Sequence, residues 1–353
     1  MTLDNARPSW LLARSSGPSL AQADAAEEVD VLSDVLRAVR LSAALFFVTD
    51  ASSPWAIQVP PGTTLAPLVM PGAQNLISYH VVASGRCWCR VAGAVPVRLD
   101  VGDVIVIPHG HSYALSLGPE IVRPWPPEDV LDFFRMMAAG SLPFTVTEGG
   151  GGPDRLQLVC GFLGCDAGPF NPVLGTLPPA LRVGCVNSDH DDRLAHLIRF
   201  AMAESSEPRS GSACVRQRIA ELMFVEVVRR HLSNLAPGHG GWLAGLRDPV
   251  VGRALELLHR HADQPWTIGT LAREAATSRS ALAERFVQLV GIPPMQYLAR
   301  WRMQLATRLL ADGNAKVAAI AARVGYESEA AFSRAFTRVV GMPPAAWRRQ
   351  RAR

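Results

Sequence analysis

A motif that occurs twice near the end of the chain restricts the possible fold more than any other feature of the sequence. Each copy has two short stretches with apolar residues at helical spacing, separated by a turn and followed by Gly-x-Pro-Pro. The matching positions lie fifty residues apart: Leu282, Phe286, Gly291, Pro293 and Pro294 correspond to Phe332, Phe336, Gly341, Pro343 and Pro344. Two short helices that meet at a tight turn form a helix-turn-helix, so the repeat predicts a tandem pair.

The second helix of each copy is predicted to have one buried face. Apolar side chains at i, i+4, i+7 and i+8 share that face. They are Leu282, Phe286, Leu289 and Val290 in the first copy and Phe332, Phe336, Val339 and Val340 in the second. Ser278 and Ser328 precede these helices. We expect each to cap its helix by accepting a hydrogen bond from an unpaired backbone amide.

The opposite faces combine small residues with one or two long polar ones, which suits a helix in the major groove of DNA. The candidate base-reading residues are Ser280, Ala281 and Glu284 in the first copy, beside Gln288, and Ala330, Arg334 and Arg338 in the second. The candidate phosphate contacts are Arg279, Arg285, Arg300, Arg302 and Arg338, with the capping residues Ser278 and Ser328. Phosphate contacts set affinity and salt dependence rather than sequence preference.

Arg334 lies at the centre of the second outward face. Its guanidinium can donate to O6 and N7 of one guanine, which discriminates between bases by ~1–3 kcal/mol; a phosphate contact is the alternative. Glu284 is the counterpart in the first copy and can accept from a cytosine amino group. It can equally pair with Arg279 or Arg285, or pack on a neighbouring helix.

The segment between the copies is predicted to be one helix from Pro293 to about Ala311, because Pro-Pro opens it and Asp312-Gly313-Asn314 closes it. At ~1.5 Å per residue it is roughly 28 Å long. Successive major grooves on one face of DNA are ~34 Å apart. A rigid connector of this length lets one chain read two adjacent grooves.

These motifs resemble the DNA-binding domain of AraC/XylS-type transcription regulators from about Asp248 to Arg353. The resemblance rests on the double motif, the linker pattern from Tyr297 to Ala306, and the closing Gly325-Tyr326-x-Ser328-x-x-x-Phe332-x-Arg334-x-Phe336. It implies a sequence-specific regulator that binds promoter sites on double-stranded DNA. Such a regulator is expected to act as a homodimer, to contact RNA polymerase if it is an activator, and to respond to a small-molecule effector or an oxidant.

Charge divides the chain in the same way. From Asp248 onward sixteen Arg and Lys face eight Asp and Glu, giving +8; the preceding 247 residues hold nineteen against twenty-three, giving −4, and the sum is the formal +4. The basic half is therefore the half expected to meet phosphate. This charge also argues against a third hypothesis, in which the repeated motif serves only protein contacts.

The first half is predicted to contain a helix over 29–39 and then short strands divided by Pro-rich turns, which favours an antiparallel barrel or sandwich. The expected strands are 43–49, 56–59, 76–83, 86–91, 95–99, 104–107, 113–117 and 156–162. Val97 to Gly110 resembles the second cupin motif, and the half from Val29 to Leu181 resembles the cupin-type sensor of some AraC-type regulators. The fold class is therefore α+β in two domains, a cupin-like barrel followed by an all-α DNA-binding domain.

The expected organisation has five parts. They are a mobile tail over 1–28, the sensor domain over 29–185, a helical connector and candidate dimerisation region over 186–235, a hinge over 236–247, and the DNA-binding domain over 248–353. The connector stretch from Cys214 to His231 is apolar over more than half its circumference. Such a helix needs two partners, for which the sensor and a second copy of the chain are candidates.

Three histidines, His80, His109 and His111, are candidates for one metal site, because imidazoles grouped in threes suit zinc, iron or copper. Metal-binding cupins carry His-x-His and Glu in the first motif, whereas Val81 and Val82 follow His80, and Tyr113 replaces a histidine of the second motif. We therefore predict no metal, no cofactor and no catalytic residue. The alternative function is a cupin-fold metal enzyme with a helical appendage.

Four cysteines are candidates for redox sensing: Cys87, Cys89, Cys160 and Cys165. Cys87 and Cys89 share one face of a strand, and Arg86 and Arg90 beside them are cations of the kind that lowers a thiol pKa. Cys160 and Cys165 flank an expected turn over 161–164. The alternative is that all four are small buried hydrophobic residues.

Targeting signals are not evident in the sequence. The Trp10–Ala13 stretch is too short for a secretory signal, and no run of about twenty apolar residues is present. We therefore expect no membrane association and a cytoplasmic, reducing location.

Overall fold

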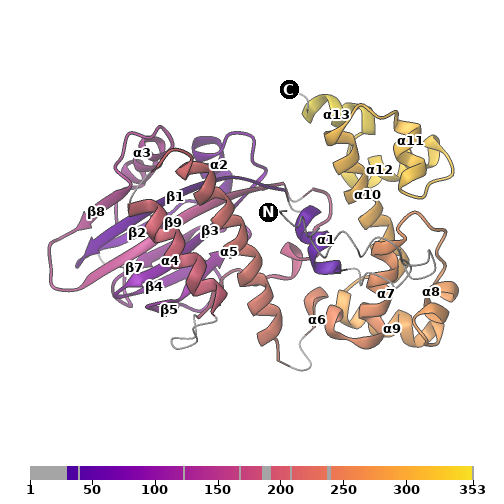
Figure 1. Ribbon diagram of the computed structural model, residues 1–353, viewed down its shortest axis with the longest axis horizontal. Helices are drawn as coiled ribbons and strands as arrows, with labels where there is room; N and C mark the ends of the chain where they lie inside the picture. The colour runs from indigo at the N-terminus through magenta and orange to yellow at the C-terminus, as the bar shows by residue number, and fades with distance from the viewer. Residues whose placement is uncertain are drawn as a thin grey trace, which may run out of the picture.

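The computed structural model describes residues 30–38, 40–121, 124–166, 168–184, 192–206, 209–236 and 240–351. The expected tail over 1–28 lies outside these ranges. A sheet-rich unit and a helical unit lie side by side (Figure 1), which confirms the predicted α+β division.

The strands of the first unit form two sheets. One has the order β10-β6-β3-β9-β1-β8 and the other β2-β7-β4-β5. The strands are β1 (Arg40–Ser52), β2 (Ala56–Val59), β3 (Asn75–Ser84), β4 (Arg86–Val91), β5 (Val97–Asp100), β6 (Val104–Ile107), β7 (Tyr113–Ser116), β8 (Thr145–Gly149), β9 (Arg155–Asp166) and β10 (Leu181–Val183). Every expected strand is present, whereas β8 and β10 were not anticipated.

The predicted barrel is not closed. Each sheet ends in its own edge strands, β10 and β8 in one and β2 and β5 in the other. The two sheets instead face each other across an apolar core to which both contribute, with Phe47 and Leu158 from one sheet and Ile57 and Leu115 from the other. This arrangement is a sandwich, in which side chains that alternate along each strand face the other sheet.

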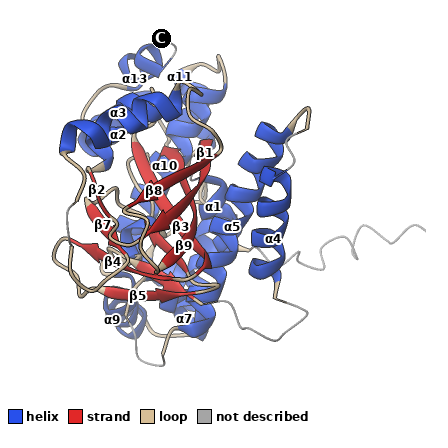
Figure 2. Ribbon diagram, turned by 90° about the vertical axis from the view of Figure 1, so that its left-hand side faces the viewer, coloured by secondary structure: helices blue, strands red, loops and turns tan. Residues whose placement is uncertain are grey.

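The opposite face of the six-stranded sheet is covered by helices (Figure 2). α5 (Ser212–Asn234) lies along it, and α4 (Arg193–Ser206) packs on α5. The predicted need of α5 for two partners is met in this chain by the sheet and α4. Phe200 and Leu222 nevertheless remain exposed, by 53% and 54%. Two further helices that the sequence did not suggest, α2 (Gly62–Val69) and α3 (Pro127–Ala138), pack on each other.

The helical unit contains the predicted pair of helix-turn-helix motifs joined by one long helix. Its elements are α6 (Trp242–Arg247), α7 (Pro249–Arg260), α8 (Ile268–Glu274), α9 (Arg279–Val290), α10 (Pro294–Asp312), α11 (Val317–Arg323), α12 (Glu329–Val340) and α13 (Pro344–Arg351). We call the first motif with its supporting helices, α6 to α9, head 1, and the second, α11 to α13, head 2. The linker helix α10 agrees closely with its predicted bounds.

The expected hinge over 236–247 is shorter in the structure. Residues 242–247 form α6, whose Trp242 and Leu243 are buried in the core of head 1. The indole Nε1–H of Trp242 donates to the Tyr297 hydroxyl at 2.9 Å. A segment packed in this way cannot act as a hinge, because bending it would expose the indole to water.

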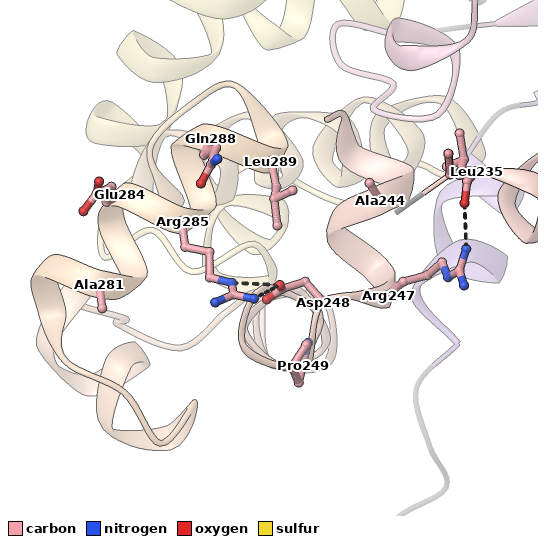
Figure 3. Close-up of a pocket in the computed structure, with 11 residues that line it drawn as sticks. Leu235, Ala244, Arg247, Asp248, Pro249, Ala281, Glu284, Arg285, Gln288 and Leu289 are labelled. Atoms are coloured by element: carbon pink, nitrogen blue, oxygen red, sulfur yellow. Dashed lines mark hydrogen bonds and ion pairs between the residues drawn. The ribbon is translucent and has the colours of Figure 1, made fainter. Parts of the chain in front are cut away.

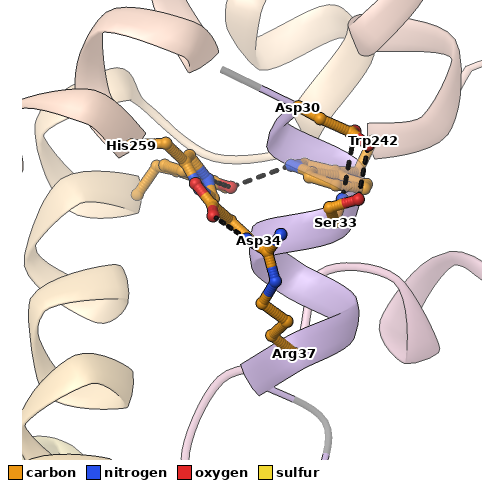
Figure 4. Close-up of polar contacts among 7 residues, drawn as sticks. Asp30, Ser33, Asp34, Arg37, Trp242 and His259 are labelled. Atoms are coloured by element: carbon orange, nitrogen blue, oxygen red, sulfur yellow. Dashed lines mark hydrogen bonds and ion pairs between the residues drawn. The ribbon is translucent and has the colours of Figure 1, made fainter. Parts of the chain in front are cut away.

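One continuous apolar core links the sensor unit to head 1, whereas head 2 has a separate core. Helix α1 (Val31–Ala38) connects the first unit to head 1 by packing against α7 and α10. In Figure 4, Asp34 of α1 points toward His259 of α7, with the Asp34 Oδ2 and His259 Nδ1 atoms 3.8 Å apart. Burial lowers the pKa of His259 to about 3, so the imidazole is neutral at pH 7 and this approach is not an ion pair.

Candidate nucleic-acid interface

Both outward helices begin at the predicted serine caps. The Ala281 amide donates to Ser278 Oγ at 3.2 Å, and the Ala331 amide donates to Ser328 Oγ at 3.2 Å. Both helices end at a glycine with positive φ, Gly291 at 84° and Gly341 at 86°, a backbone conformation that glycine adopts without a steric penalty. The two outward helices therefore have matching ends.

Helix α9 buries Leu282 and Phe286 completely, as predicted, while Leu289 and Val290 are only half-buried. The four residues assigned to the outward face, Ser280, Ala281, Glu284 and Gln288, are all exposed. Within the described ranges, Glu284 makes no ion pair. The first head therefore presents two small residues, a carboxylate and an amide to solvent.

Helix α12 buries Phe332 and Phe336, as predicted, and Ala335 with them. The prediction for Val339 was wrong, because its side chain is 37% exposed. Val339 lies in the last turn of α12, one turn after Ala335 on the same side of the helix, so the buried stripe ends before the helix does. The outward residues Ala330, Arg334 and Arg338 are exposed, and in the described part of the chain Arg334 makes no hydrogen bond or ion pair.

Of the candidate phosphate contacts, Arg285 is already paired. Its Nε and Nη2 atoms lie 2.7 Å and 2.5 Å from Oδ2 of Asp248 (Figure 3). Asp248 also caps α7 by accepting from the Val250 and Val251 amides. Burial acts to raise the Asp248 pKa, but these hydrogen bonds outweigh it and hold the pKa below its usual value. The Asp248-Pro249 pair is a helix-start signal, but the sequence analysis did not assign Asp248 a partner.

The two linker arginines that were predicted to contact phosphates both have partners within the protein. Arg302 donates to the backbone carbonyls of Ala262, Gln264 and Gly325, so all three of its nitrogens are occupied within the protein. The guanidinium of Arg300 lies over the ring of Phe170, 5.9 Å from its centroid, on the side of α10 that meets the sensor unit. Sequence spacing placed both residues on α10 correctly but did not reveal which neighbour each side chain meets.

A groove of about 730 Å³ borders the outward face of α9. Its walls include Ala281, Glu284 and Gln288 from α9 and Leu235 and Ala236 from the end of the connector. The Gly241 amide donates to the Leu289 carbonyl at 2.8 Å, which holds the start of the helical unit against the end of α9. The connector thus runs directly beside the first reading helix.

The sensor unit contacts the linker helix through a buried glutamine that the sequence analysis did not single out. Gln304 Oε1 accepts from the Phe170 amide at 3.2 Å, and Gln304 Nε2 donates to the Ala38 carbonyl at 3.3 Å. Gln304 is 4% exposed, so both ends of its amide depend on these partners. No single-sequence pattern marks such a residue, because its partners are more than a hundred positions away.

The four candidate redox cysteines are all buried. Burial raises the pKa of Cys89 to about 12 and raises those of Cys87 and Cys160 as well. The expectation that Arg86 and Arg90 lower a thiol pKa was therefore wrong. The expected turn over 161–164 was also wrong, because β9 continues without interruption from Arg155 to Asp166. These surroundings suit small buried hydrophobic residues.

The three histidines do not gather. His80 Nε2 lies 2.6 Å from the Tyr113 hydroxyl inside the sandwich, whereas His109 Nε2 lies 2.9 Å from the Leu177 carbonyl. His111 stands beside His109, with ring centroids 5.5 Å apart. Among the residues that the structure describes, no group of three or more His, Cys, Asp or Glu side chains is arranged to hold a metal ion.

The sequence did not indicate the buried pair of Glu148 and Trp55 near His80, because strand β8, which carries Glu148, was not predicted. Glu148 of β8 accepts from Trp55 Nε1 at 2.5 Å, and burial raises the pKa of Glu148 to about 7. Both side chains line a small internal cavity between the two sheets, together with His80, Tyr113 and Cys160. The cavity has a volume of about 20 Å³, which is room for about one water molecule.

Comparison with known proteins covers both units. A cupin family model matches residues 30–233, and a helix-turn-helix domain model matches residues 271–350. An AraC-like transcription regulator of Streptomyces lividans is 34% identical over 91% of this chain and 98% of its own length. The regulator AlkR of Acinetobacter baylyi is 24% identical over 91% of this chain and all of its own length.

Among solved structures, the DNA-binding domain of AdpA in complex with a target DNA is 34% identical, covers 29% of this chain and 92% of its own, and has a TM-score of 0.28. None of the helices in the described ranges is long and apolar enough to cross a membrane.

Proposed function

Because this chain belongs to the family of AraC-like transcription regulators with a cupin-type N-terminal domain, we propose that α9 and α12 enter adjacent major grooves of one promoter site. The observation that carries this proposal is the pair of matched helix-turn-helix motifs on one connector. The nineteen residues of α10 span roughly 28 Å, close to the ~34 Å between successive grooves.

Base reading falls to the exposed residues of the two helices. Arg334 donates to guanine O6 and N7, and Glu284 accepts from a cytosine amino group. The small residues Ser280, Ala281 and Ala330 allow close approach to the base edges, and Arg338 extends the reading surface of α12. This assignment rests on their exposure and on the absence of protein partners for Arg334 within the described residues.

Fewer residues are proposed to contact phosphates than the sequence suggested. Arg279 and Arg338 stand exposed at the start of α9 and the end of α12, and the capped ends at Ser278 and Ser328 present backbone amides. Arg300 and Arg302 are removed from the group because both are directed into the protein. Arg285 is paired with Asp248 and would contact a phosphate only after this ion pair opens.

Control of DNA binding is proposed to pass from the sensor to α10. A small-molecule effector that enlarged the small cavity beside Glu148 and His80 would shift the sheet next to α1 and the 168–177 segment, both of which contact Gln304. An oxidant is the weaker candidate, because the four thiols are buried and burial raises the pKa of those beside the cavity. A coupling of ~1–3 kcal/mol is enough for a switch of roughly 5- to 150-fold.

The remaining assignments follow from the regulator function. The chain acts in the cytoplasm, where the promoter is, and has no catalytic activity of its own. It binds as a homodimer in which the exposed Phe200 and Leu222 of α4 and α5 meet a second copy, and it contacts RNA polymerase if it activates transcription. The rival function, a cupin metal enzyme, is disfavoured by the separation of the three histidines.

The experiment that tests this function is selection of bound sequences from a random double-stranded pool, followed by affinity measurements at several salt concentrations. We expect two conserved boxes about one helical turn apart, and a binding constant that falls steeply with salt as phosphate counterions are released. A pool that yields no consensus, or binding that does not respond to salt, would overturn the proposal.

A further inference from the structure

We infer that Arg302 is a positioning residue that fixes the two reading heads relative to each other, and thereby sets the spacing between the two boxes that the chain reads. The inference rests on the proposed function, since it concerns how two heads share one site. Arg302 lies on α10, between the heads, and its side chain reaches both of them.

The hydrogen bonds of Arg302 bridge the two heads. Nε donates to the Ala262 carbonyl at 2.7 Å and Nη2 to the Gln264 carbonyl at 2.7 Å, both in the segment of head 1 between α7 and α8. Nη1 donates to the Gly325 carbonyl at 3.1 Å, in the turn of head 2 between α11 and α12. A planar guanidinium with its donors in a fixed fork holds three such acceptors in one orientation.

The surroundings of Arg302 reinforce this joint. The guanidinium lies over the ring of Tyr326, 5.7 Å from its centroid, so the residue after Gly325 is held as well. Lysine cannot reproduce this arrangement, because a single ammonium nitrogen cannot reach three carbonyls spread around a guanidinium. The charge is therefore used for geometry within the protein rather than for a phosphate.

Gly325 brings the backbones of the two heads into direct contact. Its φ is +79°, and a Cβ atom at this position would lie 2.4 Å from the Asp263 carbonyl oxygen and 2.6 Å from Nη2 of Arg302. The turn of head 2 thus packs on the 262–264 segment of head 1 without any side chain between them. Two residues on different elements, Arg302 and Gly325, are each required by the same contact.

This joint matters because the heads do not otherwise share a core. The apolar residues of head 1 belong to the core that continues into the sensor, and those of head 2 form a separate cluster around Phe332 and Phe336. Without the joint, α10 would still connect the heads, but long helices bend. A bend in α10 moves one reading helix out of phase with its groove.

The test uses the full-length chain with the changes Arg302→Lys, Arg302→Met and Gly325→Ala. Arg300→Lys is the matched control, because Arg300 lies on the same helix but stacks on Phe170 of the sensor. The DNA probes are the two-box site selected by the unaltered chain, the same site with one base pair inserted or removed between the boxes, and sites with either box scrambled. One base pair rotates the second box by about a tenth of a turn.

If Arg302 positions the heads, all three joint variants lose about 10-fold or more on the two-box site, equivalent to one or two hydrogen bonds. They bind scrambled-box sites within about twofold of the unaltered chain, and their preference for the selected spacing becomes shallow. Arg300→Lys keeps the steep spacing preference. The same loss on every probe would mean that Arg302 only stabilises the fold, and an unchanged spacing preference would equally overturn the inference.

Two further measurements separate a failure of folding, a failure of the proposed function and a failure of the role of Arg302. Thermal unfolding of each variant identifies one that fails to fold, and the remaining joint variants then decide the question, since Gly325→Ala disrupts the contact from head 2 without replacing Arg302. If the unaltered chain selects no two-box sequence, the proposed function has failed before any variant is measured. If it selects one and the variants keep its spacing preference, only the role of Arg302 has failed.

Discussion

Helices α9 and α12 are two copies of one reading element with opposite surface chemistry. Both start at a capping serine, bury two large apolar side chains four residues apart, and end at a left-handed glycine. At the centre of the outward face, however, α9 carries Glu284 where α12 carries Arg334. The inward residues therefore specify the shape of each helix, whereas the outward residues are free to differ and, in the proposed function, determine which bases each helix reads.

The heads also differ in how their basic residues are used. Arg285 of α9 is paired with Asp248, whereas Arg334 and Arg338 of α12 are exposed to solvent. Head 2 is therefore expected to supply most of the attraction to phosphate. Head 1, with fewer unpaired basic side chains on its outward helix, is expected to contribute mainly to discrimination between bases. Each prediction below tests one part of this contrast.

The largest loss of stability is expected from replacing a buried ring in either core, and the loss should be similar in the two heads. Phe286→Ala and Phe336→Ala each remove a completely buried ring and should cost about 3–5 kcal/mol. Chemical denaturation followed by circular dichroism measures the loss. Because the core of head 1 continues into the sensor, Phe286→Ala should also loosen the sensor, whereas Phe336→Ala should leave it intact. Equal effects on the sensor would contradict the separate cores.

The second effect concerns base reading, where the heads should differ. Arg334→Ala should weaken the preference for one guanine by about 1–3 kcal/mol and leave the other positions of the site unchanged. Glu284→Ala should relax a different position, in the other box, and should not reduce overall affinity, because it removes a negative charge near phosphate. Affinities on single-base variants of the selected site provide the measurement. A uniform loss with Arg334→Ala would reassign this residue to a phosphate.

A smaller effect, the same in both heads, is expected from the caps. Ser278→Ala and Ser328→Ala each leave one backbone amide without its acceptor and should cost about 1 kcal/mol of stability. Thermal unfolding of the two variants gives the comparison. Replacement by Asp or Asn should restore most of the loss, since both residues cap helices well. A loss that differs several-fold between the heads would show that their ends are not equivalent.

The smallest effect is expected from freeing Arg285 of its ion pair with Asp248, which tests whether this guanidinium can then contact a phosphate. Asp248→Asn keeps an oxygen that can cap α7 but removes the carboxylate that binds Arg285. The freed guanidinium is expected to take one phosphate, so the slope of log affinity against log salt should steepen by about one. Arg285→Gln is the matched control and should leave the slope unchanged. A slope unaffected by Asp248→Asn would show that Arg285 does not reach DNA.

Local patterns were enough to predict the two helix-turn-helix motifs and the linker helix, but not α6, which was taken for part of a hinge. The spacing of Leu282 and Phe286, the serine caps and the Gly-x-Pro-Pro endings all act within one or two helical turns, so their positions in the sequence determine their positions in the structure. Eight of the ten strands in the described residues were likewise found from short apolar runs, and β8 and β10 were missed. The association of the strands into two open sheets was not predicted, because sheet closure depends on which distant strands pair.

The errors at the candidate site have the same origin. Arg302 was assigned to phosphate because it is basic and lies on the linker, yet its acceptors, Ala262 and Gly325, are brought to it only by the fold. Val339 was placed inside because its spacing fits, but it lies in the last turn of α12, where its side chain is exposed. The cysteines were judged by neighbouring arginines in the sequence, whereas burial between two sheets decides their pKa.

Hydroxyl-radical footprinting of the full-length chain on its selected site most directly tests whether the two heads lie in neighbouring grooves. We expect two protected patches on the same face of the duplex, about one helical turn apart, with Arg334→Ala altering contacts in only one of them. A single protected patch, or two patches on opposite faces of the duplex, would contradict this expectation.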